Sequence, residues 1–392
     1  ALTLHTAPQP SVAIGRGTLK SNVTGQYNVA VGDRALQDNT ANFNTAVGGF
    51  ALYKNTTATH NVAFGYAALE QNTTGEYNTA IGAAALDLNV SSNNNTAVGY
   101  NALTTNTAGN NTGIGYKALE GNTTGADNTA VGTGALVANT TAAANTAVGK
   151  DALNDNTTGT RNVAVGAFAL DANTTADRNT AIGWQAMTTN TTGANNTAVG
   201  DATLENNSTG SYNVAIGQAA LAQNTTSNEN TAIGYGALDA NTTGAENTAV
   251  GSGALSANTT SNYNTAVGRQ CLLQNTGADN TGLGFEAGEN NSTGSYNIYL
   301  GFRAGLNQTT GNNNLFVGYT VGASTTTGSR NVLIGYSVQP PNGSDTMFIG
   351  SGNKTHNGNF ANHGFLGPGN SSGSYGLMYE GINSTSWSTT SD

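Results

Sequence analysis

The sequence predicts an all-β fold, a parallel β-roll or β-solenoid with about 17 residues in each coil. Three observations predict it: a glycine that returns at a fixed period, β-branched residues just before that glycine, and repeats without proline. The repeated glycine stands at positions 15, 32, 48, 65, 82, 99, 115, 132, 149, 166, 183, 200, 217, 234, 251, 268, 284, 301, 318 and 335. Successive glycines are 17 residues apart except for three steps of 16, and a short period sustained this far indicates stacked repeats rather than a globular domain.

Each repeat is predicted to contain one strand and two turns. With the glycine as position 0, Asn occupies position −4, Thr or Val −3, Ala −2 and Val or Ile −1, and this run favours a strand. Ala at +3 and Leu at +4 form a second apolar piece, and Asn-Thr-Thr-Gly from +7 to +10 is typical of a turn. The density of Gly, Asn and Thr excludes helices, because each costs several tenths to about one kcal/mol in a helix. None of the five prolines, which cannot donate to a sheet, lies between residues 11 and 339.

Stacked coils place identical side chains in rows. The asparagines at −4 and at +7 are expected to form two amide ladders, each amide bonding to the coil above and below. Strand side chains alternate between two sides, so Val at −1, including Val148, is expected inside the coil with Leu, and Ala at −2 outside. An outward alanine stripe suits close packing against another subunit, and a homotrimer is predicted. The alternative is a monomeric roll with that stripe exposed.

Four segments are predicted. Residues 1–10 form an N-terminal cap or joint, 11–283 the regular repeats, 284–350 divergent repeats and 351–392 a C-terminal tip or junction. In the divergent repeats the leucine at +4 is replaced by glycine, and aromatic residues appear in the strand, so a change in width or twist is expected.

Composition disfavours several classes of function. The net charge of −10 and the lack of a basic stripe disfavour nucleic acid binding. No run of 18 apolar residues is present, so no membrane insertion is expected, and no signal-peptide pattern is visible. Cys271 occupies a slot that alanine fills in most repeats, which indicates a small buried side chain; a reactive or interchain thiol is the alternative.

No catalytic residue, cofactor site or metal site is predicted, and the chain is not expected to be an enzyme. His356 and His363 are close in sequence, but no Cys, Asp or Glu completes a zinc spacing. The acidic residues sit at variable turn positions rather than in a repeated pair.

Aromatic residues at position +1 are the candidate contacts for a receptor, because flat rings stack on sugars and other planar groups. The candidates are Tyr66, Tyr100, Tyr116, Trp184 and Tyr235, with Trp387 near the C-terminus. The same position holds Phe285, Phe302, Tyr319 and Tyr336, and position −5 carries further rings. Corner packing and covering of a subunit seam are the structural alternatives.

Two further patterns have competing explanations. Many Asn-x-Thr/Ser triplets match glycosylation acceptors, although turn chemistry explains them without glycans. The threonines at −3 form a row that could bind ice, but valine interrupts that row repeatedly.

The repeats resemble two families of fibrous proteins. Ser11-Val12-Ala13-Ile14-Gly15 and Asn213-Val214-Ala215-Ile216-Gly217 are similar to the repeats of trimeric autotransporter adhesin heads, although those repeats are usually shorter. Runs such as 95–103 and 331–336 resemble bacteriophage tail-fibre shafts that carry a C-terminal self-cleaving intramolecular chaperone. The last residues resemble the junction where that chaperone begins, which implies a processing junction at Ser391 and Asp392.

The expected function is therefore a structural fibre shaft that displays a binding tip, and the expected type is a phage tail fibre or receptor-binding fibre on a virion or outside a cell. The expected partners are other copies of the chain, as a homotrimer or an end-to-end polymer, and a cell-surface glycan or protein receptor. A bacterial surface adhesin or secreted filament subunit is the alternative, and an ice-binding solenoid is a third hypothesis.

Overall fold

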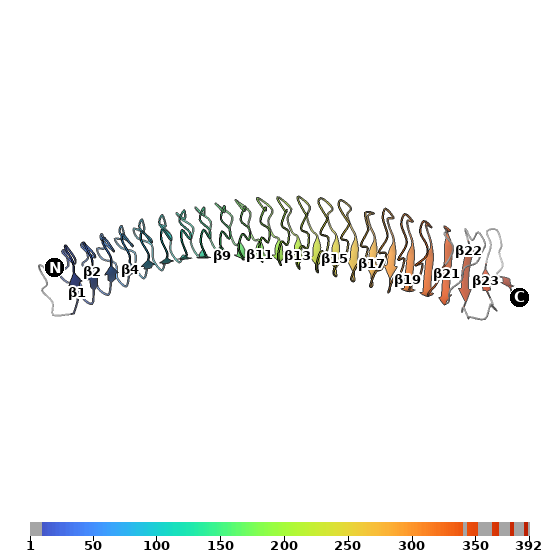
Figure 1. Ribbon diagram of the computed structural model, residues 1–392, viewed down its shortest axis with the longest axis horizontal. Helices are drawn as coiled ribbons and strands as arrows, with labels where there is room; N and C mark the ends of the chain where they lie inside the picture. Colours follow the sequence, from blue (N-terminus) through green and yellow to red (C-terminus); the bar gives the residue numbers. More distant parts are fainter. Residues whose placement is uncertain (1–9, 340–342, 352–362, 368–376, 380–387, 391–392) are drawn as a thin grey trace. The chain divides into compact units, whose positions relative to one another are not determined.

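The computed structural model is an all-β parallel solenoid of about 20 turns with about 17 residues per turn, as the sequence predicts (Figure 1). It describes residues 10–339, 343–351, 363–367, 377–379 and 388–390, and every helix or strand assigned in this part of the chain is a strand. The chain divides into two compact units, Ala1–Asn196 and Thr197–Asp392.

The first unit contributes one strand per coil. Its strands are β1 Val12–Ile14, β2 Val29–Val31, β3 Thr45–Val47, β4 Val62–Phe64, β5 Thr79–Ile81, β6 Thr96–Val98, β7 Thr112–Ile114, β8 Thr129–Val131, β9 Thr146–Val148, β10 Val163–Val165 and β11 Thr180–Ile182. Neighbouring strands pair in parallel and in register, so that Ala13 faces Ala30 and Val12 faces Val29. The register follows from the repeat, because equivalent residues meet whenever one coil is placed on the next.

The second unit continues the pattern and then changes it. Its strands are β12 Thr197–Val199, β13 Val214–Ile216, β14 Thr231–Ile233, β15 Thr248–Val250, β16 Thr265–Val267, β17 Thr281–Leu283, β18 Ile298–Leu300, β19 Leu315–Tyr319, β20 Val332–Tyr336, β21 Thr346–Ser351, β22 His363–Gly367, β23 Leu377–Tyr379 and β24 Ser388–Thr390. Strands lengthen from three residues to five at β19. The pairing is parallel as far as β22, whereas β23 and β24 pair antiparallel.

The second apolar piece of the repeat is a turn rather than a strand. Positions +2 and +4 adopt the left-handed conformation, as at Ala67 (φ 56°) and Leu69 (φ 51°). The side chains therefore do not alternate between two sides, and both Ala68 and Leu69 are buried. The turn still bonds from coil to coil, since the Leu69 amide donates to the Ala85 carbonyl at 3.0 Å.

The predicted sides of the strand are reversed in the structure. Ala147 at −2 is fully buried, whereas 37% of Val148 at −1 is exposed, and the other coils follow the same pattern. The prediction that Val148 lies inside and the alanines outside is wrong. The physical reason is the leucine at +4, which fills the thin interior and leaves room for little more than a methyl group. Even at Gly113, which has no side chain, an added Cβ would lie 3.2 Å from Leu103 Cγ.

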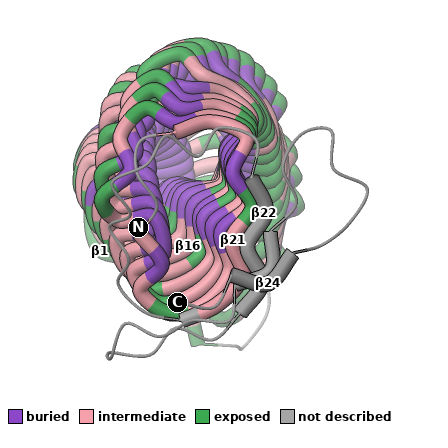
Figure 2. Tube along the Cα trace, turned by 90° about the vertical axis from the view of Figure 1, so that its right-hand side faces the viewer, coloured by how far each residue is buried: buried purple, intermediate pink, exposed green. Residues whose placement is uncertain are grey.

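The two amide ladders are confirmed. At −4, the Asn61 backbone N–H donates to Asn44 Oδ1 at 3.0 Å, and the asparagines of this row are buried. At +7, Asn72 Nδ2 donates to Asn55 Oδ1 at 2.9 Å and to the Gly75 carbonyl at 3.0 Å. Figure 2 shows the buried residues of successive coils following one another in rows. Polar groups so deep in a coil are tolerated because each has a partner in the neighbouring coil.

Position 0 needs glycine for two reasons. Gly32 has a φ of +131°, which side chains disfavour, and a Cβ there would lie 2.6 Å from the Gly48 carbonyl oxygen of the next coil. The coils therefore stack too closely at this corner for a side chain, which explains the strict period of the residue.

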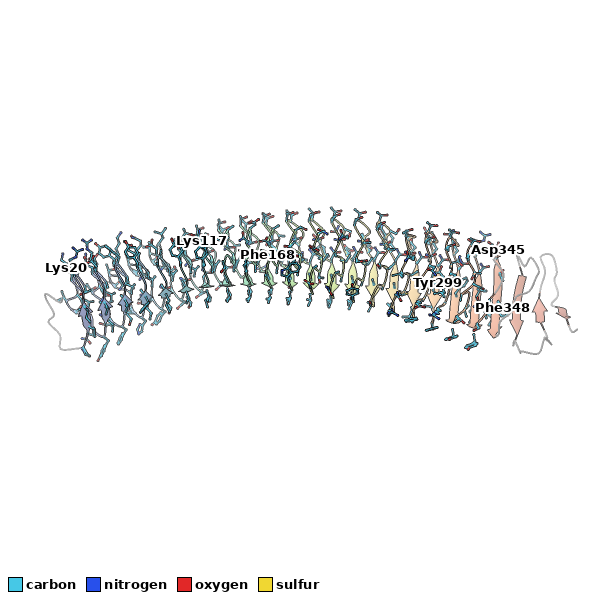
Figure 3. The ribbon with its side chains drawn as sticks, viewed as in Figure 1. Lys20, Lys117, Phe168, Tyr299, Asp345 and Phe348 are labelled. Carbon is cyan, nitrogen blue, oxygen red and sulfur yellow. The ribbon has the colours of Figure 1, made fainter. Side chains whose placement is uncertain are left out.

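In the divergent coils the strand carries the large interior side chain. Tyr299 and Phe316 stand at −2 and are fully buried, and Figure 3 marks Tyr299 along the chain. Glycines stand at +4 in the same coils, at Gly288, Gly305 and Gly322. The whole C-terminal segment 351–392 is described only through the backbone of its strands, so its role as a tip or junction stays a prediction.

Candidate interaction surface

The exposed face of the strands is an uncharged surface that the repeat creates in every coil. We call the side chains at −3 and −1 of β1–β21 the outer face. Its −1 row is Val, Ile, Leu or Phe, and its −3 row is mostly Thr or Val. Exposed fractions are 40% at Ile81 and Ile298 and reach 61% at Ile14. No charged residue stands at either position in these strands.

The outer face is unusual for a protein surface because it repeats in every coil. Isolated exposed hydrophobic residues are common on soluble proteins, whereas contiguous ones mark interaction sites. Within each unit the strands pair in register, so the exposed side chains of one coil lie directly beside those of the next. The apolar residues at −3 and −1 could be read from the sequence. The alternation of strand side chains does not say which side faces water, because that depends on where the leucine at +4 lies.

The structure places the predicted receptor contacts on the surface but does not bring all of them together. Tyr66, Tyr100, Tyr116, Trp184 and Tyr235 are each more than half exposed. Tyr100 and Tyr116 stack with ring centroids 5.8 Å apart, and Tyr66 meets Phe50 edge-on at 5.9 Å. In the described chain, Trp184 and Tyr235 stack on no other ring. Trp387, Ser391 and Asp392 lie outside the described residues.

A second set of rings at position −5 forms a stacked row. Tyr27, Phe43, His60 and Tyr77 follow one another with centroid distances of 5.0–5.2 Å. In such a row each inner ring is covered on both faces by its neighbours, and only the ring edges remain accessible. Stacking of a sugar on these faces is therefore disfavoured, whereas no other described ring covers a face of Trp184 or Tyr235.

The longest row at +1 lies in the divergent coils. Phe285, Phe302, Tyr319 and Tyr336 stack with centroids 5.1–5.3 Å apart and planes within 9° of parallel. Arg303 stands over Phe302 at 5.1 Å, and its Nε donates to Glu286 at 2.6 Å. This row could have been predicted from the sequence, because four consecutive repeats carry an aromatic residue at +1.

Cys271 and Asp171 in the described chain each have a strongly raised pKa. Burial raises the pKa of the Cys271 thiol to about 12, which agrees with a small buried side chain rather than a reactive one. Burial, with Asp155 and Asp151 nearby, raises the pKa of Asp171 to about 6. Among the described residues, no three His, Cys, Asp or Glu side chains gather to hold a metal ion. The side chains of His356 and His363 are outside the described part.

The asparagines at +7 leave no room for a glycan in the folded coil. Asn122 and Asn139 both begin Asn-x-Thr triplets, and both are fully buried. Asn139 Nδ2, the atom that would carry the sugar, donates to Asn122 Oδ1 at 2.7 Å and to the Ala142 carbonyl at 3.0 Å. Turn and ladder chemistry therefore accounts for these triplets.

Comparisons with protein-family models, with curated proteins and with solved structures gave no match for this chain. Within the described residues, the structure contains no helix with the length and hydropathy needed to cross a bilayer.

Proposed function

We propose that this chain is a structural fibre segment whose copies associate through the outer face, with a homotrimer as the basic unit. The observation that carries the proposal is the uncharged, partly exposed row at −1, which recurs coil after coil. The side chains of the outer face repeat once per coil. A second copy of the chain has rows with the same spacing, so its outer face can match this one along many coils. Burying such a row would stabilise the assembly by about 25 cal/mol for each Å² of apolar area.

The resemblance to phage tail-fibre shafts and autotransporter heads supports the same proposal. Under it, the ladders of the coil give stiffness, and the fibre holds a binding end away from a virion or cell. A bacterial surface adhesin or secreted filament is the alternative setting, and self-association through the outer face is common to both. Trp184 and Tyr235, on which no other described ring stacks, are then candidate contacts for a receptor outside the subunit seam.

The experiment uses two substitutions at neighbouring positions. Wild-type mass in solution, measured by light scattering after gel filtration, is expected at three times the 39.5 kDa of one chain. Val148→Asp places a charge on the outer face, so it should weaken association while the far-ultraviolet circular dichroism stays unchanged. Ala147→Asp places the charge inside the coil and should unfold that region instead.

A monomeric wild-type chain at all concentrations would refute the proposal. Unfolding by Val148→Asp with no effect of Ala147→Asp would contradict the assignment of the two sides.

One observation favours a second candidate, an ice-binding solenoid. The threonines at −3, such as Thr79 and Thr96, lie on the outer face with partly exposed side chains rather than inside the coil. Thermal hysteresis of the purified chain tests this candidate directly. Its absence would remove the hypothesis, whereas its presence in a monomeric chain would replace the fibre proposal.

A further inference from the structure

The outer face is not uniform along the second unit. In the regular coils, position −3 is threonine or valine, but from β18 onward it is Ile298, Leu315, Val332 and Met347. The row of hydroxyls is thus replaced by a row of larger apolar side chains. Ile298 and Met347 are each 40% exposed, so this change adds apolar surface that meets water.

The same coils extend the strands toward a row of rings. Strands β19 and β20 continue through the glycine to position +1, and Tyr319 pairs with Tyr336 in register. Tyr319 and Tyr336 are 46% and 59% exposed, and Phe302 is 36% exposed. The apolar surface therefore has three rows here, at −3, −1 and +1, where the regular coils offer one row of Val or Ile beside one of mostly Thr or Val.

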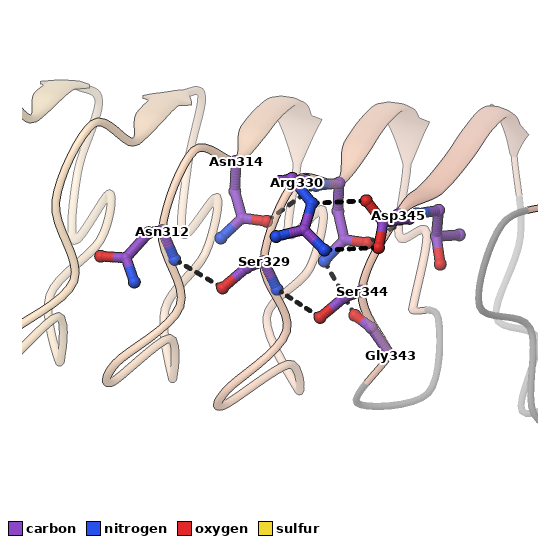
Figure 4. A network of polar contacts seen from close by, with 9 residues as sticks. Asn312, Asn314, Ser329, Arg330, Gly343, Ser344 and Asp345 are labelled. Carbon is purple, nitrogen blue, oxygen red and sulfur yellow. Dashed lines mark hydrogen bonds and ion pairs between the residues drawn. The ribbon is translucent and has the colours of Figure 1, made fainter.

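Both the interior and the border of this surface are firmly held. Behind the strands, Tyr299, Phe316 and Leu333 are fully buried, so the strands rest on large packed side chains. Along the border at −5, Arg330 Nη2 donates to Asp345 Oδ2 at 2.7 Å, and the Ser329 amide donates to Ser344 Oγ at 3.1 Å (Figure 4). An apolar centre with a polar border is the usual composition of a protein–protein interface.

We infer that the side chains at −3 and −1 of strands β18–β21, with the +1 rings Phe302, Tyr319 and Tyr336, form the strongest part of the interface between copies of this chain. We call these side chains the C-terminal apolar patch. The inference rests on the proposed function and locates its dominant contact. The occupant is a second copy, because the patch is uncharged and its rows repeat at the strand spacing, as do the rows of the copy that would cover it. The regular coils contribute weaker contacts, since Thr side chains bury less apolar area and bring hydroxyls that must be paired.

The test compares one substitution at two equivalent positions. Leu315→Glu charges the patch at −3, and Thr197→Glu places the same charge at −3 of a regular coil in the same unit. Sedimentation velocity over a dilution series gives the concentration at which each full-length assembly half dissociates. We expect Leu315→Glu to raise that concentration at least about tenfold over wild type and Thr197→Glu to raise it much less.

A third variant, without an added charge, helps to distinguish loss of assembly from misfolding. Tyr319→Ser removes an exposed ring without adding charge, and it should shift dissociation in the same direction as Leu315→Glu. Circular dichroism and urea unfolding of each variant separate loss of fold from loss of assembly. An oligomer that responds equally to Leu315→Glu and Thr197→Glu, or that ignores Tyr319→Ser, would overturn this inference and leave the proposed function standing. A monomeric wild-type chain would overturn both.

Discussion

In the regular coils the strand contributes an alanine to the interior and the opposite wall contributes a leucine, whereas around Tyr299 and Phe316 the strand contributes a ring and the opposite wall a glycine. The large side chain thus moves from position +4 on the opposite wall to position −2 in the strand, while the backbone keeps its period of 17 residues. A Cβ at Gly288 would lie 2.5 Å from Tyr299 Cδ2, so the ring occupies the space that the leucine fills elsewhere. The total side-chain volume in the interior therefore stays similar along the repeats, and a residue of either wall can fill that space.

The two regions also differ in their polar interior. The +7 ladder runs through the regular coils to Asn291, and Gln308 and Thr325 then take the position of asparagine. The Tyr299 hydroxyl lies 3.5 Å from Asn291 Oδ1, the acceptor that the next asparagine of the ladder would use. Burial raises the pKa of Tyr299 well above its ordinary value, so the hydroxyl stays protonated. The −4 ladder continues, since the Asn331 amide donates to Asn314 Oδ1 at 3.0 Å.

The largest expected effect tests whether the two walls share one volume. Tyr299→Ala should destabilise the chain by about 3–5 kcal/mol, because glycine on the opposite wall cannot fill the cavity. Adding Gly305→Leu, which restores the regular pair, should recover part of that loss, while Gly305→Leu alone should overpack against Tyr299. Urea unfolding followed by circular dichroism measures all three variants. Tyr235→Ala, at an exposed ring that stacks on no other ring in the described chain, is the control, and a double variant no more stable than Tyr299→Ala would contradict the shared volume.

A smaller effect separates the polar interiors. Asn139→Ala leaves Asn122 Oδ1 without its donor and removes one of the two bonds that Asn156 Nδ2 makes, at an expected cost of about 2–4 kcal/mol. The Ala142 carbonyl keeps its bond from Asn128 Nδ2. Gln308 donates to the Gly328 carbonyl, but its Oε1 is buried without a partner. Gln308→Ala should therefore cost at least about 1 kcal/mol less than Asn139→Ala. Hydrogen exchange in the adjoining coils and urea unfolding measure the difference, and equal losses would show that the ladder adds no stability.

The coil, the register of its strands and both amide ladders could be predicted from the sequence. Each depends only on equivalent residues of successive repeats lying side by side when the coils stack. The sequence pattern did not predict which side chains of the strand face the interior and which face water. Val148 and Ala147 are both apolar, and the choice between them depends on the leucine at +4, whose left-handed backbone no periodicity rule describes. The five aromatic candidates within the described residues are exposed, but whether a ring is stacked, as Tyr100 is, or has no ring beside it, as Trp184 does, depends on which residue stands one coil away.

The smallest effect concerns a single coil in which the regular pair is altered. Gly282 stands at −2 where most regular coils carry alanine, and a Cβ there would overlap the Cys271 Sγ and lie 3.1 Å from Leu272 Cγ. Gly282→Ala should therefore cost about 1–3 kcal/mol by overpacking. Cys271→Ala restores the common residue at +3, and the double variant should be more stable than Gly282→Ala alone by about the size of that loss. A double-mutant cycle in urea measures the coupling, with Ser256→Ala, on a part-buried turn of the same unit, as the control. Additive effects of the two substitutions would mean that sulfur and methyl do not compete for one space, and that the exchange of bulk seen at Tyr299 is peculiar to the divergent coils.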